Sequence, residues 1–212
     1  AAGEAREKAG DAEGEKAVRS HLASGLVTAA EIYLTDCCFE PDAEARASYL
    51  LERALAVDQT NWEALLGMGN LRISQCKNDE ALGFVQKSVA LWSELPPADQ
   101  PPYDFRKATA KILIELGQHD TAIEILSDLL DEDDEVFDVW YLRGLCLFMI
   151  KDGGASLSDL EAAVTVYKKY DLSAAPEMRE VFDHIIQLAQ EIKAQSPGGP
   201  DGPADPTTVD KP

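Results

Sequence analysis

The sequence predicts an all-α protein built from repeated helix pairs. Three observations favour this fold class: apolar residues recur at three- and four-residue spacing from about 18 to 195, glycine and proline separate the apolar stretches, and strand-like alternation does not persist. Hydrophobic residues make up 45% of the 212 residues, which is enough to form a core. An ordered helical region is therefore expected, and not a wholly disordered chain.

Nine helices are predicted in chain order, and several boundaries carry a residue that a helix cannot continue through. The prolines of ELPPADQPPY, 94–103, stiffen a connection between the fourth and fifth helices. Gly117 marks the turn before the sixth helix, and Pro176 opens the first turn of the ninth. The predicted ranges are 18–39, 43–57, 61–75, 79–93, 103–117, 119–131, 135–150, 155–170 and 175–195.

The segments SYLLERALAVD, FVQKSVALW, EILSDLLDED and LEAAVTVYKK align as equivalent parts of a repeat. The alignment places Ala54, Ser88, Leu129 and Ala163 at one position, and the successive separations are 34, 41 and 34 residues. The tetratricopeptide repeat has a 34-residue period. The longer interval contains an insertion of seven residues within the proline-rich connection. The sequence therefore predicts a right-handed tetratricopeptide-repeat superhelix of about four helix pairs.

Small residues at other repeat positions fall into the same register. The residues that let paired helices approach each other are Gly69, Ala110 and Gly144. The small residues early in the second helix of each pair are Ala47, Ala81, Ala122 and Ser156. Trp140 occupies a large aromatic position of the fourth repeat, where Leu65 stands in the second. Agreement of four repeats in phase is stronger evidence than a match to one of them.

The two ends of the chain differ in composition from the repeats. The helix at 175–195 has an apolar stripe of Val181, Ile185, Leu188 and Ile192 with charged residues around it, which suits a C-terminal capping helix. The tail 196–212 is rich in proline, glycine and aspartate, and we expect it to be disordered, like residues 1–16. The predicted organisation is a disordered N-terminus at 1–16, a repeat domain with its cap at 17–195 and a disordered tail at 196–212.

Charge is the most informative property of the composition. The chain has 19 basic and 39 acidic residues and a net charge of −20. Such a surface repels nucleic acid and anionic lipid and attracts basic ligands, so no direct nucleic-acid or membrane partner is expected. The same charge could serve solubility alone.

Catalytic and metal-binding motifs are missing from the sequence. The three histidines are far apart, and a phosphate-binding loop, a nucleotide-binding glycine fingerprint, a nucleophile elbow and an HExxH motif are not found. The four cysteines lack the spacing of a zinc site or a disulfide framework. No catalytic, cofactor-binding or metal-binding residue is predicted, and the protein is not expected to be an enzyme.

The first helices of such repeats line a concave face that usually holds an extended peptide. Helical phase predicts that acidic and apolar side chains on this face bind a basic ligand. The predicted residues are Asp36, Glu40, Glu63, Leu66, Asn70, Ile73, Glu115, Asp138, Tyr141 and Leu145. The acidic run Asp131 to Glu135 has two interpretations, a solvated turn between repeats or a docking site for lysine and arginine.

Two segments, EIYLTDCCFEPDAEARASYLLERALAVD and NWEALLGMGNLRISQ, resemble the fungal tetratricopeptide-repeat assembly chaperone of large-subunit ribosomal protein four. The motif LTDCCFEPDAE carries most of this resemblance. The resemblance implies that the protein binds the long, basic internal loop of that ribosomal protein and escorts it to nuclear pre-ribosomes. We expect a monomer that binds its client one-to-one, in the cytoplasm and in the nucleus.

The leading prediction is therefore a dedicated ribosomal-protein chaperone without a cofactor. A basic loop left unshielded would bind RNA nonspecifically through its phosphates, so carboxylates on a concave surface could compete with RNA. The alternative prediction is a generic acidic repeat scaffold that binds another basic peptide or protein.

Overall fold

The computed structural model describes residues 2–195, and the side chains from residue 13 onward except that of residue 174. The predicted C-terminal tail, 196–212, lies outside the described residues. Between 2 and 195 the regular structure is helical and contains no strand, so the predicted all-α class is confirmed. Within the same range, a helix with the length and apolar character of a membrane span is not found.

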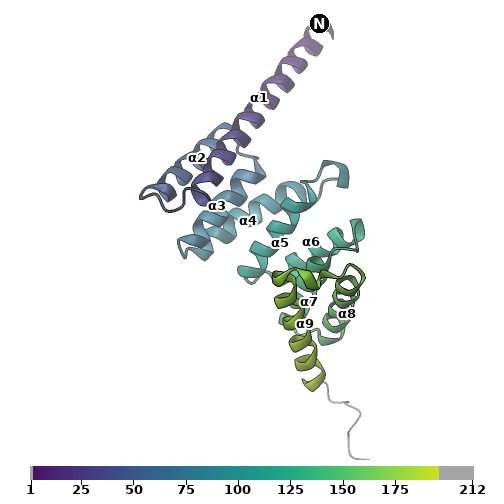
Figure 1. Ribbon diagram of the computed structural model, residues 1–212. Coiled ribbons are helices and arrows are strands. Elements are labelled where there is room, and N and C mark those ends of the chain that lie inside the picture. The colour runs from purple at the N-terminus through teal and green to yellow at the C-terminus, as the bar shows by residue number, and fades with distance from the viewer. Residues whose placement is uncertain (1, 196–212) are drawn as a thin grey trace, which may run out of the picture. The chain divides into compact units, whose positions relative to one another are not determined.

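The chain divides into two units, Ala1–Gln118 and His119–Pro212. The first unit contains α1 (Ala2–Leu34), α2 (Ala43–Val57), α3 (Trp62–Ser74), α4 (Asn78–Trp92), a 3₁₀ turn at Pro97–Asp99 and α5 (Tyr103–Glu115) (Figure 1). Here α1 packs on α2 and α3 on α4 as antiparallel pairs, while α2 and α1 also contact α3 and α4 contacts α5. The division falls between α5 and α6, which are the helices predicted to form the third repeat, so their pairing stays a prediction.

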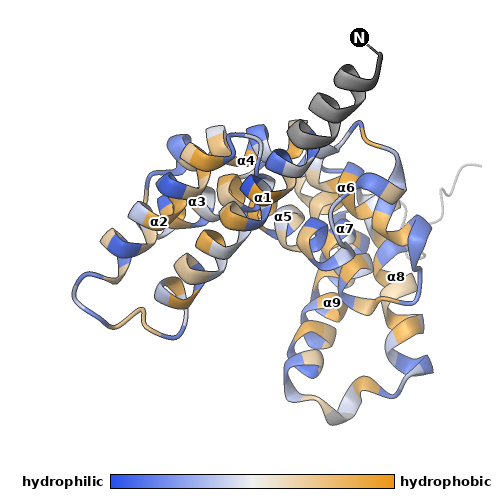
Figure 2. Ribbon diagram, turned by 90° about the horizontal axis from the view of Figure 1, so that it is seen from above, coloured by the Kyte–Doolittle hydropathy of each residue, from blue (hydrophilic) through white to orange (hydrophobic). Residues whose placement is uncertain are grey.

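The second unit contains α6 (His119–Glu132), α7 (Phe137–Met149), α8 (Gly153–Lys169), a 3₁₀ turn at Leu172–Ala174 and α9 (Pro176–Gln195). Each helix packs on the next: α6 on α7, α7 on α8 and α8 on α9. The helices carry apolar and polar residues on different sides (Figure 2), as expected for amphipathic helices that share a core. On α9 the predicted stripe buries Ile185, Leu188 and Ile192, while the outer side is largely polar.

The repeat register predicted from the small residues is confirmed by burial. The residues aligned at the two second-helix positions are all completely buried, at 0% exposure: Ala47, Ala81, Ala122 and Ser156, and Ala54, Ser88, Leu129 and Ala163. Two hydroxyl groups in this set donate hydrogen bonds to backbone carbonyls of the paired helix. Ser88 Oγ donates to the Trp62 carbonyl at 2.9 Å, and Ser156 Oγ donates to the Gly144 carbonyl at 2.7 Å. The small residues are therefore required by close packing within helix pairs.

Two glycines show how close that packing is. A Cβ atom added at Gly69 would lie 2.7 Å from a methyl carbon of Val85, and one added at Gly144 would lie 3.1 Å from a methyl carbon of Leu160. Both distances are shorter than ordinary contact, so a larger residue would push the paired helices apart. Gly117 has a different role, since its φ of +73° fits the left-handed turn predicted there.

The first helix differs from the prediction at both ends. The sequence predicts disorder at 1–16 and a helix over 18–39, whereas α1 begins at Ala2 and ends at Leu34. Every side chain from Glu13 to Leu22 is exposed, and packing begins at Ala23, so hydrophobic periodicity gives no signal for the first turns. At the other end, the Cys37 amide closes the helix by donating to the Ile32 carbonyl at 2.8 Å, and the chain turns before Pro41.

Candidate functional site

In the first unit, α3 and α5 carry four of the predicted ligand-facing residues, Glu63, Asn70, Ile73 and Glu115. Glu63 lies in the first turn of α3 and accepts a hydrogen bond of 2.9 Å from Ser24 Oγ of α1. Asn70 is exposed and Ile73 is half-buried farther along α3. Glu115, also exposed, ends α5. These positions offer two carboxylates, an amide and an aliphatic side chain to a ligand.

Three predicted residues take other positions. Asp36 and Glu40 lie in the turn between α1 and α2 because α1 ends at Leu34, and Glu40 pairs with Arg46 at 3.5 Å. Leu66 is only 6% exposed, so its side chain belongs to the core and cannot serve as a ligand-facing residue. Helical phase misplaces Leu66 because α3 packs against α4, α2 and α1, and so buries more than one side.

In the second unit, α7 presents a stripe with three- and four-residue spacing. Asp138, Tyr141, Leu145 and Phe148 are all half-buried along it. The Tyr141 hydroxyl is 2.8 Å from Nδ1 of His184 on α9, and the two rings meet edge to face with centroids 5.8 Å apart. Partial burial raises the pKa of the Tyr141 phenol, which keeps this group neutral and able to donate. The stripe therefore runs beside α9 and combines a carboxylate with aromatic and aliphatic groups.

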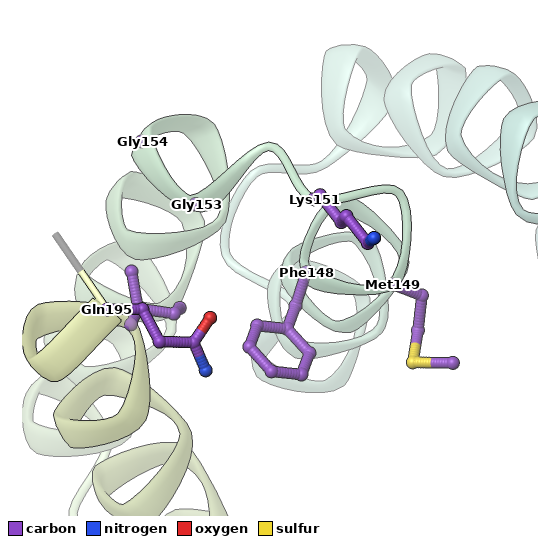
Figure 3. A pocket seen from close by; sticks show the side chains of 7 residues that line it. Phe148, Met149, Lys151, Gly153, Gly154 and Gln195 are labelled. Carbon is purple, nitrogen blue, oxygen red and sulfur yellow. The ribbon is translucent and has the colours of Figure 1, made fainter.

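A pocket of about 660 Å³ opens at the end of this stripe (Figure 3). It lies between the C-terminal end of α7, the start of α8 and the end of α9, and its lining includes Phe148, Lys151, Ile192 and Gln195. The Phe148 ring and the Gln195 side chain face one another across the space, whereas the Met149 side chain points away. An apolar side chain with a polar end fits this lining. Sequence reasoning missed the pocket because its walls come from three separate elements.

Gly153 lets α9 approach the start of α8 closely. A Cβ atom at Gly153 would lie 3.2 Å from a methyl carbon of Ile192. The preceding Lys151 has a φ of 67°, in the left-handed region, which reverses the chain between α7 and α8. The glycine is visible in the sequence, whereas the left-handed conformation of Lys151 is seen only in the structure.

The acidic run Asp131 to Glu135 lies at the end of α6 and in the turn before α7 and is exposed throughout. Its last members already have partners in the chain: Glu135 accepts hydrogen bonds from Lys169 and Tyr170, and the Trp140 indole donates to the Asp134 carbonyl at 2.6 Å. The hydrogen bond from Lys169, with that from Tyr170, lowers the pKa of the Glu135 carboxyl. The contacts fit the predicted inter-repeat turn.

Metal coordination has no support among the described side chains, because no cluster of three histidine, cysteine, aspartate or glutamate residues has a suitable arrangement there. Exposed carboxylates are instead spread over helices and turns of both units, among them Glu52 of α2, Glu115 of α5 and Asp128 of α6. A surface of this kind can attract a cationic ligand over several ångströms and hold it through many weak contacts.

Comparison with known proteins adds direct evidence about relatives. No family model matches the chain. Two curated fungal proteins, both named "Probable assembly chaperone of rpl4", are similar to it. The Schizosaccharomyces pombe protein is 32% identical over 165 residues, which is 74% of this chain and 49% of that protein. The Emericella nidulans protein is 36% identical over 126 residues, which is 58% of this chain and 33% of that protein. The chain thus spans about half, or less, of the length of these curated relatives.

Solved structures agree with the sequence comparison. The structure of an assembly chaperone of RpL4 (Acl4), residues 1–338, has a TM-score of 0.60 and 34% identity and covers 66% of this chain and 50% of that chain. YrrB, a tetratricopeptide-repeat protein, has a TM-score of 0.53 at 18% identity, with coverage of 80% and 86%, and it shows the fold alone. The tetratricopeptide-repeat fold and the resemblance to the fungal assembly chaperone are both confirmed.

Proposed function

We propose that this chain is a non-enzymatic chaperone that binds and shields the basic internal loop of the large-subunit ribosomal protein for which its relatives are named. The observation that carries the proposal is the similarity, at 32–36% identity, to two proteins named as assembly chaperones of rpl4. That similarity favours a dedicated client over the alternative of a generic acidic scaffold. Shielding in the cytoplasm and escort to nuclear pre-ribosomes would follow from the same role.

The charge of the chain supports a basic client. With 39 acidic and 19 basic residues, the protein attracts a cationic loop and repels rRNA. Individual exposed ion pairs contribute about 0–1 kcal/mol each, so the affinity must come from many contacts. Binding is therefore expected to weaken steeply with salt, as RNA binding by the same loop would.

The apolar part of the surface supports binding of an extended segment in one register. On α7, Tyr141, Leu145 and Phe148 follow one another toward the pocket shown in Figure 3. Aliphatic or aromatic side chains of a client loop could occupy these positions while its lysines and arginines meet carboxylates such as Asp138. Charge would bring the two proteins together, and apolar contacts would align them.

The identity of the client is tested by isolating the tagged chain from cells during translation and sequencing the associated messenger RNA. Enrichment of one ribosomal-protein message is expected. A diverse set of messages would refute a dedicated chaperone and favour a scaffold. Binding of the isolated loop would then be measured by fluorescence anisotropy at increasing salt.

The surface is tested by charge reversal. Glu63→Lys combined with Asp138→Lys should weaken binding of the loop roughly 10- to 100-fold, because each site changes from attraction to repulsion. The matched control is Glu52→Lys with Asp128→Lys, two exposed acids on the second helices α2 and α6 that give the same net charge. Equal effects of the two pairs would show that charge acts only at long range and that the first helices are not the contact surface.

A further inference from the structure

A second surface lies on the first helix pair and combines apolar and aromatic side chains with two arginines, Arg46 and Arg53. A groove of about 410 Å³ runs between α1 and α2, which pack side by side (Figure 1), and it is lined by Tyr33, Asp42, Ala45, Arg46, Tyr49 and Leu50. Tyr33 and Leu50 form its floor, since both are half-buried against the core of the unit. Tyr49 stands on the rim and is 57% exposed.

This groove is separate from the proposed client surface. Ser24, which contacts Glu63, and Tyr33 of the groove lie on the same helix α1. They are separated by about two and a half helical turns, which places them on opposite sides of α1. A ligand in the groove would therefore not compete directly with a ligand beside Glu63.

Aromatic rings hold the arginines of the rim in place. The Arg46 guanidinium lies over the Tyr33 ring, 5.4 Å from its centroid, and donates to the Tyr33 hydroxyl at 3.2 Å. It also pairs with Asp42 at 3.0 Å and with Glu40 at 3.5 Å. Arg46 is thus fixed and largely neutralised within the chain, and it forms a wall of the groove and not a free charge.

Arg53 is fixed in a similar way but keeps its charge. Its guanidinium lies 5.7 Å from the centroid of the Tyr49 ring and donates to the Tyr49 hydroxyl at 2.9 Å. Among the residues that the structure describes, no carboxylate forms an ion pair with Arg53, although the chain has 39 acidic residues. A guanidinium held by a tyrosine loses little side-chain entropy when it binds a carboxylate, which makes such pairs effective in recognition.

From the groove and this arginine we propose that the α1–α2 surface binds a partner peptide that carries a carboxylate beside aliphatic or aromatic side chains. The carboxylate would pair with Arg53, and an apolar side chain would lie on Tyr33 and Leu50. Phe39 could add a contact, because it is 95% exposed in the turn whose Glu40 binds Arg46. Charge complementarity at contact selects this ligand class, because the acid that lines the groove, Asp42, is paired with Arg46, whereas Arg53 has no carboxylate partner among the described residues.

The test begins with a phage-displayed library of short random peptides, selected on the whole chain and counter-selected on the Arg53→Gln variant. We expect the enriched peptides to share acidic and apolar residues. For a synthetic copy of the best peptide, Arg53→Gln should weaken binding roughly tenfold in fluorescence anisotropy, the scale of a lost charge-assisted hydrogen-bond pair. Replacement of the peptide's carboxylates by amides should cause the same loss, with no further loss in the Arg53→Gln variant.

Lys87→Gln is the matched control. Lys87 is also exposed and lies over an aromatic ring, 5.9 Å from the centroid of Phe84, so the substitution removes the same charge from the same unit outside the groove. It should change peptide affinity by less than about twofold. Enrichment of basic peptides, or equal effects of the two variants, would overturn the proposal.

The oligomeric state provides the remaining test. If sedimentation shows a dimer that Arg53→Gln dissociates, the groove holds a second copy of this chain, and the partner-peptide proposal is wrong. Binding of the ribosomal loop should be unaffected by Arg53→Gln in either case. Failure of the acidic-peptide proposal is therefore distinguishable from failure of the chaperone proposal.

Discussion

The ion pair between Arg143 of α7 and Asp159 of α8 is expected to be the most sensitive polar contact of the second unit. Arg143 Nε donates to Asp159 Oδ2 at 2.7 Å and a terminal nitrogen donates to Oδ1 at 2.9 Å, a two-bond geometry. The other terminal nitrogen reaches Ser127 Oγ of α6 at 3.2 Å. The Asp159 side chain is 7% exposed and that of Arg143 is 20% exposed, so water cannot replace these bonds easily. One side chain thereby links three helices.

Asp159→Asn should therefore destabilise the unit strongly. Removing one partner of a buried pair leaves the other charge without compensation and costs about 3–5 kcal/mol. Because the amide can still accept one hydrogen bond, we expect the low end, about 3 kcal/mol, which corresponds to a fall in Tm of roughly 6–12 °C for a chain of this size. Urea and thermal unfolding followed by far-ultraviolet circular dichroism measure both quantities.

The double variant Arg143→Met with Asp159→Leu separates the value of the pair from the cost of breaking it. Two apolar residues of similar volume leave no buried charge, so the double variant should recover most of the stability lost in Asp159→Asn. A change below about 0.5 kcal/mol for Asp159→Asn, the range of ordinary surface substitutions, would refute the reasoning. So would a double variant less stable than the single one.

Three further predictions concern packing, reactivity and capping. Gly69→Ala should destabilise the fold by about 1–3 kcal/mol, because the new Cβ would lie 2.7 Å from a valine methyl carbon. Gly83→Ala is the control and should be neutral or stabilising, because a Cβ there would have nothing within 4 Å. Equal melting temperatures of the two variants would contradict the packing argument. Burial raises the pKa of the Cys146 thiol to about 11, so it stays protonated, and hence unreactive, until the pH approaches that value. Mass spectrometry after iodoacetamide treatment at mildly alkaline pH should find exposed Cys38 modified and Cys146 unmodified, and equal labelling would count against the burial of Cys146. Asn61→Ala should cost about 1 kcal/mol in urea unfolding, because the Asn61 side chain accepts the Ala64 amide at 2.7 Å and caps α3; an unchanged midpoint would show that the cap contributes nothing.

The repeat register was predictable because close helix packing leaves a direct mark on the sequence. Ala54, Ser88 and Ala163 are small and completely buried, and only the third repeat has a large residue, Leu129, at the equivalent position. Their spacing therefore reports the geometry of the helix pairs even where the larger repeat residues differ. The limits of α2 at 43–57 were predicted to the residue for the same reason, since its buried stripe is continuous.

The ligand-facing side was less predictable, because helical phase does not tell which neighbours a helix has. Leu66 and Tyr141 both lie on first helices, and helical phase predicts that both side chains face the ligand. Leu66 is buried because α1 and α2 also pack on α3, whereas Tyr141 is half-buried and bonded to His184. Partners such as His184, far along the chain from Tyr141, are fixed only by the tertiary arrangement.

The same limit explains why the pocket and the α1–α2 groove escaped sequence reasoning. The groove depends on Tyr33 and Tyr49, which come from different helices. It also depends on two arginines whose direction is fixed by the rings and hydroxyl groups of these tyrosines. In the sequence, these arginines are visible only as two of the positive charges in a chain with a net charge of −20. A net charge describes the field far from the molecule, and the arrangement of individual groups decides what binds at contact.

Under the proposed function, this distinction bears on how the chain could release a basic client. If charge alone held the loop, rRNA, with its dense phosphates, would remove it at once, and the chaperone could not protect the loop in a cell rich in RNA. Apolar contacts along Tyr141, Leu145 and Phe148 do not weaken with salt and are not offered by phosphate. They would slow dissociation while carboxylates speed association. If the proposed function holds, release on the pre-ribosome would require a site that offers the loop both phosphate and shape, which free RNA does not.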